Sequence, residues 1–217
     1  EYLLPQIRLG TLWNVLGADV DIGFVLVGSL GALIMTIVNY IGIRTAAILQ
    51  TIVTVLIVMA GILLITGAAF NGDPAHAQPW IAEPSTGILA VLIMVPAMLI
   101  GFDVIPQSAE EINLPPNKIG RLLIISVVLA VLWYILITAA VGFALPVASI
   151  GNSQLATANA ATALWQGKWA GTILVLGGIG GILTSWNAFI VGASRVMFAL
   201  SESGFLPPAF ARLHPKY

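Results

Sequence analysis

The feature that most constrains this chain is a single carboxylate, Asp103, inside an apolar run long enough to cross a membrane. An ionisable side chain at membrane depth is costly and is usually retained for function. Pro96, Gly101 and Pro106 surround it at intervals of five residues. Proline removes a backbone donor and glycine weakens a helix, so we expect a helix broken near its middle. Broken helices at membrane depth line cavities or are buried in protein, and transporters build substrate sites from them, so this feature points to transport.

The composition indicates an integral membrane protein. Of the 217 residues, 59% are hydrophobic and 8% are charged, and the mean hydropathy is +1.03. Soluble domains carry about 25% charged residues. The net charge of -1 argues against a basic nucleic-acid-binding surface, and the absence of cysteine excludes disulfides and thiolate metal sites. No signal peptide is visible at the N-terminus. We expect the chain to be a piece of a longer protein, because it begins and ends abruptly.

Apolar runs of membrane length predict an all-α fold class, with a single transmembrane domain fragment that crosses the bilayer five times. The expected spans are about 22–41, 45–70, 85–108, 119–146 and 169–200. The third span is the broken one, and Trp133 and Tyr134 in the fourth span are expected to pack against neighbours. Residues 1–21 are expected to hold the end of an earlier helix and an external loop, and residues 201–217 a cytoplasmic loop.

The distribution of lysine and arginine sets the expected orientation. One side of the membrane carries six basic residues: Arg44, Lys118, Arg121, Arg195, Arg212 and Lys216. The other side carries Arg8 and Lys168. By the positive-inside rule the first side is cytoplasmic, so the loops 71–84 and 147–168 are external. We expect a multi-pass protein of the plasma membrane, which in a bacterium is the inner membrane.

Three acidic residues in or beside the broken span are candidate functional groups. Asp103 has three open roles: binding a substrate amine or cation, carrying a proton, or capping backbone N–H groups freed at the break. Glu110 and Glu111 lie at the cytoplasmic end of the span. They are either a solvated helix end paired with Lys118 or Arg121, or an inner gate that forms in one transporter state.

The fifth span carries polar residues far from either interface. Trp186 either packs in the core or lines the substrate cavity. Asn187 needs partners in hydrocarbon and should face the helix bundle, where it is a candidate substrate contact. Thr184 and Ser185 either offer oxygens to a coupling cation or bond back to the preceding helical turn. The glycines of residues 177–181 predict a close approach between helices.

Several segments, in order along the chain, resemble one family. Residues 39–50 look like the link between helices four and five of amino acid permeases, in the amino acid–polyamine–organocation superfamily. Residues 101–103 followed by 109–111 resemble the sixth helix, and residues 194–207 with 214–216 resemble the end of helix eight and the loop after it. The resemblance implies helices four to eight of a transporter of roughly twelve helices. It also implies part of the leucine-transporter fold, with inverted repeats and a broken sixth helix.

The resemblance also implies where the substrate binds. In such permeases the amino acid contacts the unwound part of helix six, which corresponds to Ala97 to Asp103, chiefly Ile100, Gly101 and Phe102. Related transporters often have an aromatic gate where Ala97 stands, so the small residue here implies a roomier side-chain pocket.

The coupling ion stays open between sodium and the proton. Some proton-coupled relatives carry a lysine where Ile57 stands, so that route of proton coupling is not expected here. Thr184 and Ser185 resemble the helix-eight hydroxyls of sodium-coupled relatives. Sodium coupling, exchange, and proton coupling through Asp103 are the three alternatives, and no other cofactor is expected.

The sequence as a whole predicts a secondary active transporter of amino acids or related amines that works by alternating access. The alternative is a substrate sensor or a channel on the same fold, without coupled transport. An enzyme is not expected: aspartyl proteolysis needs two carboxylates in one site, and Asp103 is the only deep one. His76 and His214 lie in opposite loops, so no zinc site is expected. The expected partners are the small-molecule substrate and the lipid bilayer, and the oligomeric state is left open.

Overall fold

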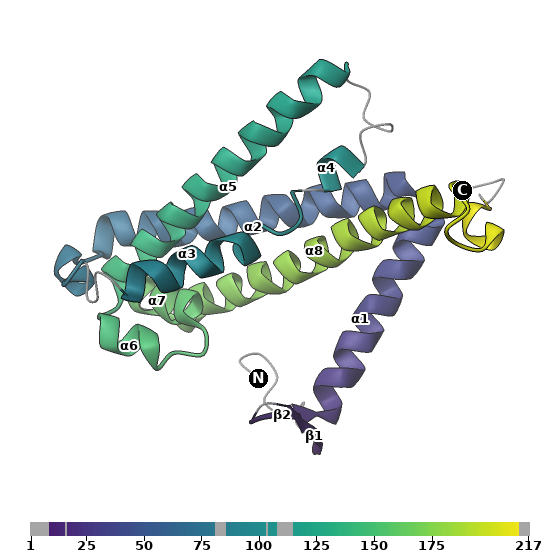
Figure 1. Ribbon diagram of the computed structural model, residues 1–217. Coiled ribbons are helices and arrows are strands. Elements are labelled where there is room, and N and C mark those ends of the chain that lie inside the picture. Colours follow the sequence, from purple (N-terminus) through teal and green to yellow (C-terminus); the bar gives the residue numbers. More distant parts are fainter. Residues whose placement is uncertain (1–8, 16, 81–85, 103, 108–114, 213–217) are drawn as a thin grey trace.

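The fold is built almost wholly from helices. The structure is a computed structural model that describes residues 9–15, 17–80, 86–102, 104–107 and 115–212. Four helices in this part of the chain are long and apolar enough to cross a membrane, and a shorter apolar helix, α3, occupies the position of the remaining expected span (Figure 1). The elements are β1 (Thr11–Val15), β2 (Ala18–Asp21), α1 (Ile22–Ile41), α2 (Ile43–Asn71), η2 (Pro74–Ala77), α3 (Thr86–Met98), α4 (Val104–Gln107), α5 (Pro116–Ala144), α6 (Val147–Gly151), α7 (Ala156–Trp165), α8 (Lys168–Glu202) and η4 (Pro208–Ala211).

A small hairpin precedes the first long helix, in a region where the sequence predicts a loop. Strands β1 and β2 pair antiparallel. Asn14 organises the turn, because its side chain accepts a hydrogen bond from the Gly17 N–H at 3.0 Å and donates one to Asp19 at 2.9 Å. Asp21 then caps α1 by accepting from the Gly23 N–H at 2.8 Å. These strands are too short to contain an apolar run of membrane length, so the apolar pattern of the sequence does not reveal them.

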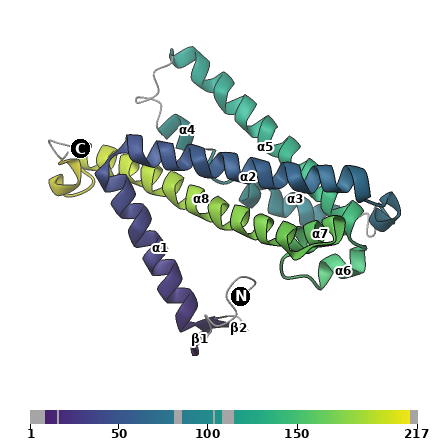
Figure 2. The same ribbon diagram turned by 180° about the vertical axis from the view of Figure 1, so that it is seen from behind.

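Helices α2 and α8 lie side by side over most of their length and form the spine of the molecule (Figures 1 and 2). Glycines in α8 permit this approach. A Cβ atom built at Gly180 would lie 2.7 Å from Val53 Cγ1, and one built at Gly177 would lie 3.0 Å from Ala60 Cβ. A Cβ at Gly181 would meet no atom within 4 Å, so only part of the glycine run faces α2.

The buried core sits at one end of this spine, where α2, α5, α7 and α8 meet. It consists mainly of small side chains, which let helix backbones approach closely: Leu64, Ala68, Ala140, Val141, Ala144, Ala160, Ala161, Leu164 and Ala170. Two hydrogen bonds tie the same end together. The Trp165 indole donates to the Leu63 carbonyl at 3.0 Å, and the Asp73 N–H donates to the Phe143 carbonyl at 2.9 Å.

Helix α1 meets α2 at a sharp corner and then diverges from the spine (Figures 1 and 2). Gly42 forms the corner with φ +144°, a conformation that side-chain-bearing residues rarely adopt. Near the middle of α1, Gly31 accommodates the Trp186 ring of α8, since a Cβ there would lie 2.6 Å from Trp186 Cζ3.

Candidate functional site

The expected break in the third membrane segment is present, and it falls between α3 and α4. Helix α3 runs through Pro96 and ends at Met98. The Leu99 N–H is shared between the Val95 carbonyl at 3.2 Å and the Pro96 carbonyl at 3.3 Å. Gly101 then adopts φ +110°, which no α-helix contains. Proline therefore loosens the last turn of α3, and the glycine conformation completes the break.

The chain resumes a helical course directly after the break. The N–H groups of Val104 and Ile105 donate to the carbonyls of Gly101 and Phe102, each at 3.2 Å. Helix α4 packs against α5 and α8. Gly192 of α8 lies at this contact, where a built Cβ would lie 2.6 Å from Gln107 Oε1 and 3.2 Å from Val104 Cγ2. The far side of the break is thus anchored on the α8 spine.

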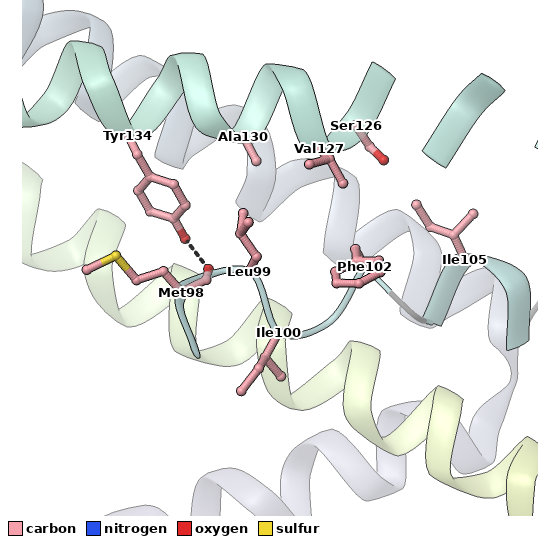
Figure 3. A pocket seen from close by; sticks show the side chains of 9 residues that line it. All are labelled: Met98, Leu99, Ile100, Phe102, Ile105, Ser126, Val127, Ala130 and Tyr134. Carbon is pink, nitrogen blue, oxygen red and sulfur yellow. Dashed lines mark hydrogen bonds between the residues drawn. The ribbon is translucent and has the colours of Figure 1, made fainter. Parts of the chain in front are cut away.

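A pocket of about 240 Å³ lies between the break and α5 (Figure 3). Its lining is mostly apolar and comprises Met98, Leu99, Ile100, Phe102, Ile105, Ser126, Val127, Ala130 and Tyr134. Figure 3 shows Leu99 directed toward α5 and Ile100 directed away from it. The Tyr134 hydroxyl donates to the Met98 carbonyl at 3.0 Å, across the mouth of the break.

The residues predicted to contact substrate take different places around this break. Ile100, Gly101 and Phe102 form the non-helical turn, as expected. Ala97 lies in the last turn of α3, so unwinding begins at Leu99 rather than at Ala97. Helix α3 extends past Ala97 because the carbonyls of Val95 and Pro96 still accept a hydrogen bond from the Leu99 N–H, although Pro96 itself has no N–H to donate. Asp103, Glu110 and Glu111 lie outside the described residues.

The polar residues of the fifth span face a different set of helices. Asn187 is 6% exposed; its side-chain amide donates to Gln50 Oε1 at 3.0 Å, and its oxygen accepts from Asn39 Nδ2 at 2.8 Å. Asn39 Nδ2 also donates to the Met35 carbonyl. These three amides join α1, α2 and α8, so the hydrogen bonds of Asn187 described here go to neighbouring helices and not to the break. Trp186 packs against Gly31 of α1 beside them.

The two hydroxyls considered for ion coupling bond within their own helix. Thr184 Oγ1 donates to the Gly181 carbonyl at 2.9 Å, and Ser185 Oγ donates to the same carbonyl at 3.0 Å. This is the back-bonded geometry common for hydroxyls in apolar helices. Both hydroxyl hydrogens are donated to the Gly181 carbonyl, so each side chain could bind a cation through the lone pairs of its oxygen.

Sequence reasoning did not anticipate three hydrogen bonds that the tertiary structure forms. Tyr134 was expected only to pack, yet its hydroxyl reaches the break from a helix 36 positions further along the chain. Asn39 and Gln50 were not expected to share hydrogen bonds with Asn187. The sequence does indicate that a hydroxyl or amide inside an apolar span needs a hydrogen-bond partner, but it does not identify that partner.

Comparison with known proteins agrees with this architecture. The family model of the amino acid permeases matches residues 10–217. The branched-chain amino acid permease BcaP of Bacillus subtilis is 26% identical over 183 residues, which cover 84% of this chain and 39% of that protein. The chloroplastic cationic amino acid transporter 9 of Arabidopsis thaliana is 22% identical over 208 residues, which cover 94% of this chain and 36% of that protein.

A human protein, cationic amino acid transporter 4, is 26% identical over 189 residues, covering 87% of this chain and 28% of that protein. The chain thus spans about a third of the length of these curated relatives, all of which are named as permeases or transporters and not as enzymes. The match over residues 10–217, together with the four membrane-length helices, confirms the expected resemblance and the all-α membrane fold: the chain belongs to the amino acid permease family and is part of a multi-pass membrane protein.

Proposed function

We propose that the protein is a secondary active transporter that moves amino acids or related amines by alternating access. The substrate is held at the non-helical turn between α3 and α4. The observation that carries this proposal is the break itself: a membrane-length apolar segment is interrupted at Gly101, with φ +110°, beside a pocket of about 240 Å³.

The chemistry of the break suits the ammonium group of an amino acid or amine. The Val95 and Pro96 carbonyls share one donor, the Leu99 N–H, so the last turn of α3 offers more carbonyl oxygens than backbone donors, and the carboxyl end of a helix carries partial negative charge. An ammonium group is attracted to such a site. Because the surroundings are apolar, a hydrogen bond from the ammonium group to a backbone carbonyl is electrostatically stronger here than it would be at a water-exposed surface.

Counterflow in proteoliposomes that contain the full-length protein tests the proposal. Vesicles are loaded with one unlabelled amino acid or amine at a time, and entry of labelled leucine or lysine is followed. The panel includes branched-chain and cationic amino acids, because the relatives' names mention both classes. Accumulation with a subset supports transport. Binding of a substrate without accumulation, in protein shown to be folded, would favour a sensor or a channel.

Coupling is tested in the same vesicles. We propose sodium or the proton as the coupling ion. Loss of uptake on removing the sodium gradient would identify sodium as the coupling ion. Thr184 and Ser185 would then be the candidate sodium ligands to substitute. For the proton, Asp103→Asn separates the roles of Asp103, because a backbone cap tolerates the amide and a proton carrier does not.

A further inference from the structure

The carbonyl at the end of α3 has an unusual partner. In an uninterrupted α-helix the Met98 carbonyl would accept from the N–H of Phe102, four residues later. Here residues 99–102 leave the helix, and the Met98 carbonyl instead accepts from the Tyr134 hydroxyl of α5 at 3.0 Å (Figure 3). The hydroxyl therefore satisfies the acceptor that a continuing helix would use.

Little else in the described part of the chain holds this end of α3. Helix α4 packs on both α5 and α8, whereas α3 packs extensively on neither. A second, apolar pocket of about 790 Å³ separates α3 from α5 on the other side of Tyr134. Met98 and Tyr134 line both pockets, and their exposed fractions are 54% and 46%. Their hydrogen bond is thus a discrete tie between two loosely packed helices.

Local sequence permits the break without fixing its position. Pro96 leaves the Leu99 N–H shared between two carbonyls, so the last turn of α3 has no single hydrogen-bond register. Gly101 allows the positive φ but does not require it. A partner from outside the segment is what selects one end point for the helix.

We propose that Tyr134 is a positioning residue: its hydroxyl bond to the Met98 carbonyl fixes where α3 ends and so sets the conformation of residues 99–102. Its consequence for substrate affinity rests on the proposed function, because those residues then form the binding site. If the bond is lost, the Met98 carbonyl is released to pair with Phe102, and the binding-competent turn is populated for a smaller fraction of the time.

The test is Tyr134→Phe in the full-length protein, which removes the hydroxyl and keeps the ring. Thr138→Val is the matched control, because Thr138 lies one turn along α5 and lines the second pocket but not the break pocket. Spin labels on cysteines replacing Leu89 of α3 and Leu122 of α5, in a cysteine-free background, report the distance between the two helices. We expect Tyr134→Phe to shift or broaden that distance distribution, and Thr138→Val to leave it superimposable on the parent's.

Substrate affinity is the second readout. A hydrogen bond of typical net strength shifts the equilibrium between the two turn conformations about fivefold, so the Kd should rise in Tyr134→Phe by up to about fivefold. A merely structural role would lower the melting temperature and leave the Kd of the folded protein unchanged. Tyr134→3-fluorotyrosine, which keeps a hydroxyl donor of nearly the same shape, serves if Tyr134→Phe does not fold, and its distance distribution and Kd should match the parent's.

The outcomes separate this inference from the proposed function. An unchanged distance distribution in Tyr134→Phe overturns it, and so does a changed distribution with an unchanged Kd. A distribution and a Kd altered as strongly by Tyr134→3-fluorotyrosine as by Tyr134→Phe would also overturn it. If the parent protein binds no amino acid, the proposed function fails, while the distance measurement still decides whether Tyr134 positions the break.

Discussion

Helix α8 and the α3–α4 segment respond in opposite ways to helix-weakening residues. Helix α8 contains six glycines and continues without interruption over the 35 residues Lys168–Glu202. The α3–α4 segment is broken around one glycine, Gly101, that follows Pro96. The number of glycines therefore does not decide continuity. In α8 the glycines carry no positive φ and several receive a neighbour's side chain, whereas Gly101 has φ +110° and no atom within 4 Å of a built Cβ.

The difference teaches that glycine has two separate uses in one membrane domain. Against α2, Gly177 and Gly180 remove side-chain volume so that two helices approach closely. At the break, Gly101 supplies a backbone conformation that other residues reach only with strain. Substituting glycines of each kind distinguishes these uses.

Gly180→Leu should have the largest effect. A Cβ at this position already lies 2.7 Å from Val53 Cγ1, so leucine must push α2 and α8 apart. We expect a loss of about 3 kcal/mol in the free energy of unfolding, at the upper end of overpacking costs. Thermal unfolding of the full-length protein in detergent measures it. Gly178→Leu is the control, since no atom lies within 4 Å there; equal losses in both variants would contradict the packing role.

Gly101→Ala should come next. Alanine at φ +110° is strained by about 2 kcal/mol, and the chain relieves this by moving the break. We expect amino acid affinity to fall roughly thirtyfold, measured as the Kd of the full-length transporter. Gly120→Ala in α5 has open space and no positive φ, so it should leave affinity unchanged. An affinity retained in Gly101→Ala would show that the positive φ is not needed for binding.

Asn187→Ala tests whether interhelical hydrogen bonds, in addition to close packing at glycines, stabilise the position of α8. The substitution leaves Gln50 and Asn39 without the partner they share, and we expect a loss of about 1.5 kcal/mol in unfolding free energy. Ser185→Ala should change stability by less than about 0.5 kcal/mol, because its hydroxyl bonds only the preceding turn of its own helix. Chemical denaturation compares the two, and similar losses would argue against a special role for the amide cluster.

Apart from the control substitutions, Gly178→Ala should give the smallest effect, and of opposite sign. With no neighbour within 4 Å of the new Cβ, the substitution gains helix propensity and should stabilise the protein by about 0.5–1 kcal/mol. Gly177→Ala places its Cβ 3.0 Å from Ala60 Cβ and should not be stabilising. Melting temperatures of the pair measure the difference, and stabilisation of both would remove Gly177 from the interface.

Local sequence patterns predicted much of the helical structure of this molecule. The apolar run 22–41 became α1 with the same bounds, because a helix satisfies its own backbone inside a membrane. The combination of Pro96 and Gly101 located the break to within a few residues, because both act on their own backbone. The hairpin at residues 11–21 escaped prediction, since its turn depends on side-chain bonds of Asn14 that an apolar pattern does not reveal.

What the sequence determined by itself is the membrane class, the order of the spans, the family and the existence of a broken helix, since each depends on composition or short-range backbone chemistry. The tertiary structure alone decided which partners the polar groups find. Asn187 bonds to residues 137 and 148 positions away, and Tyr134 reaches a carbonyl 36 positions away. A buried donor must be satisfied, but its partner is chosen by helix packing, and no local pattern encodes that choice.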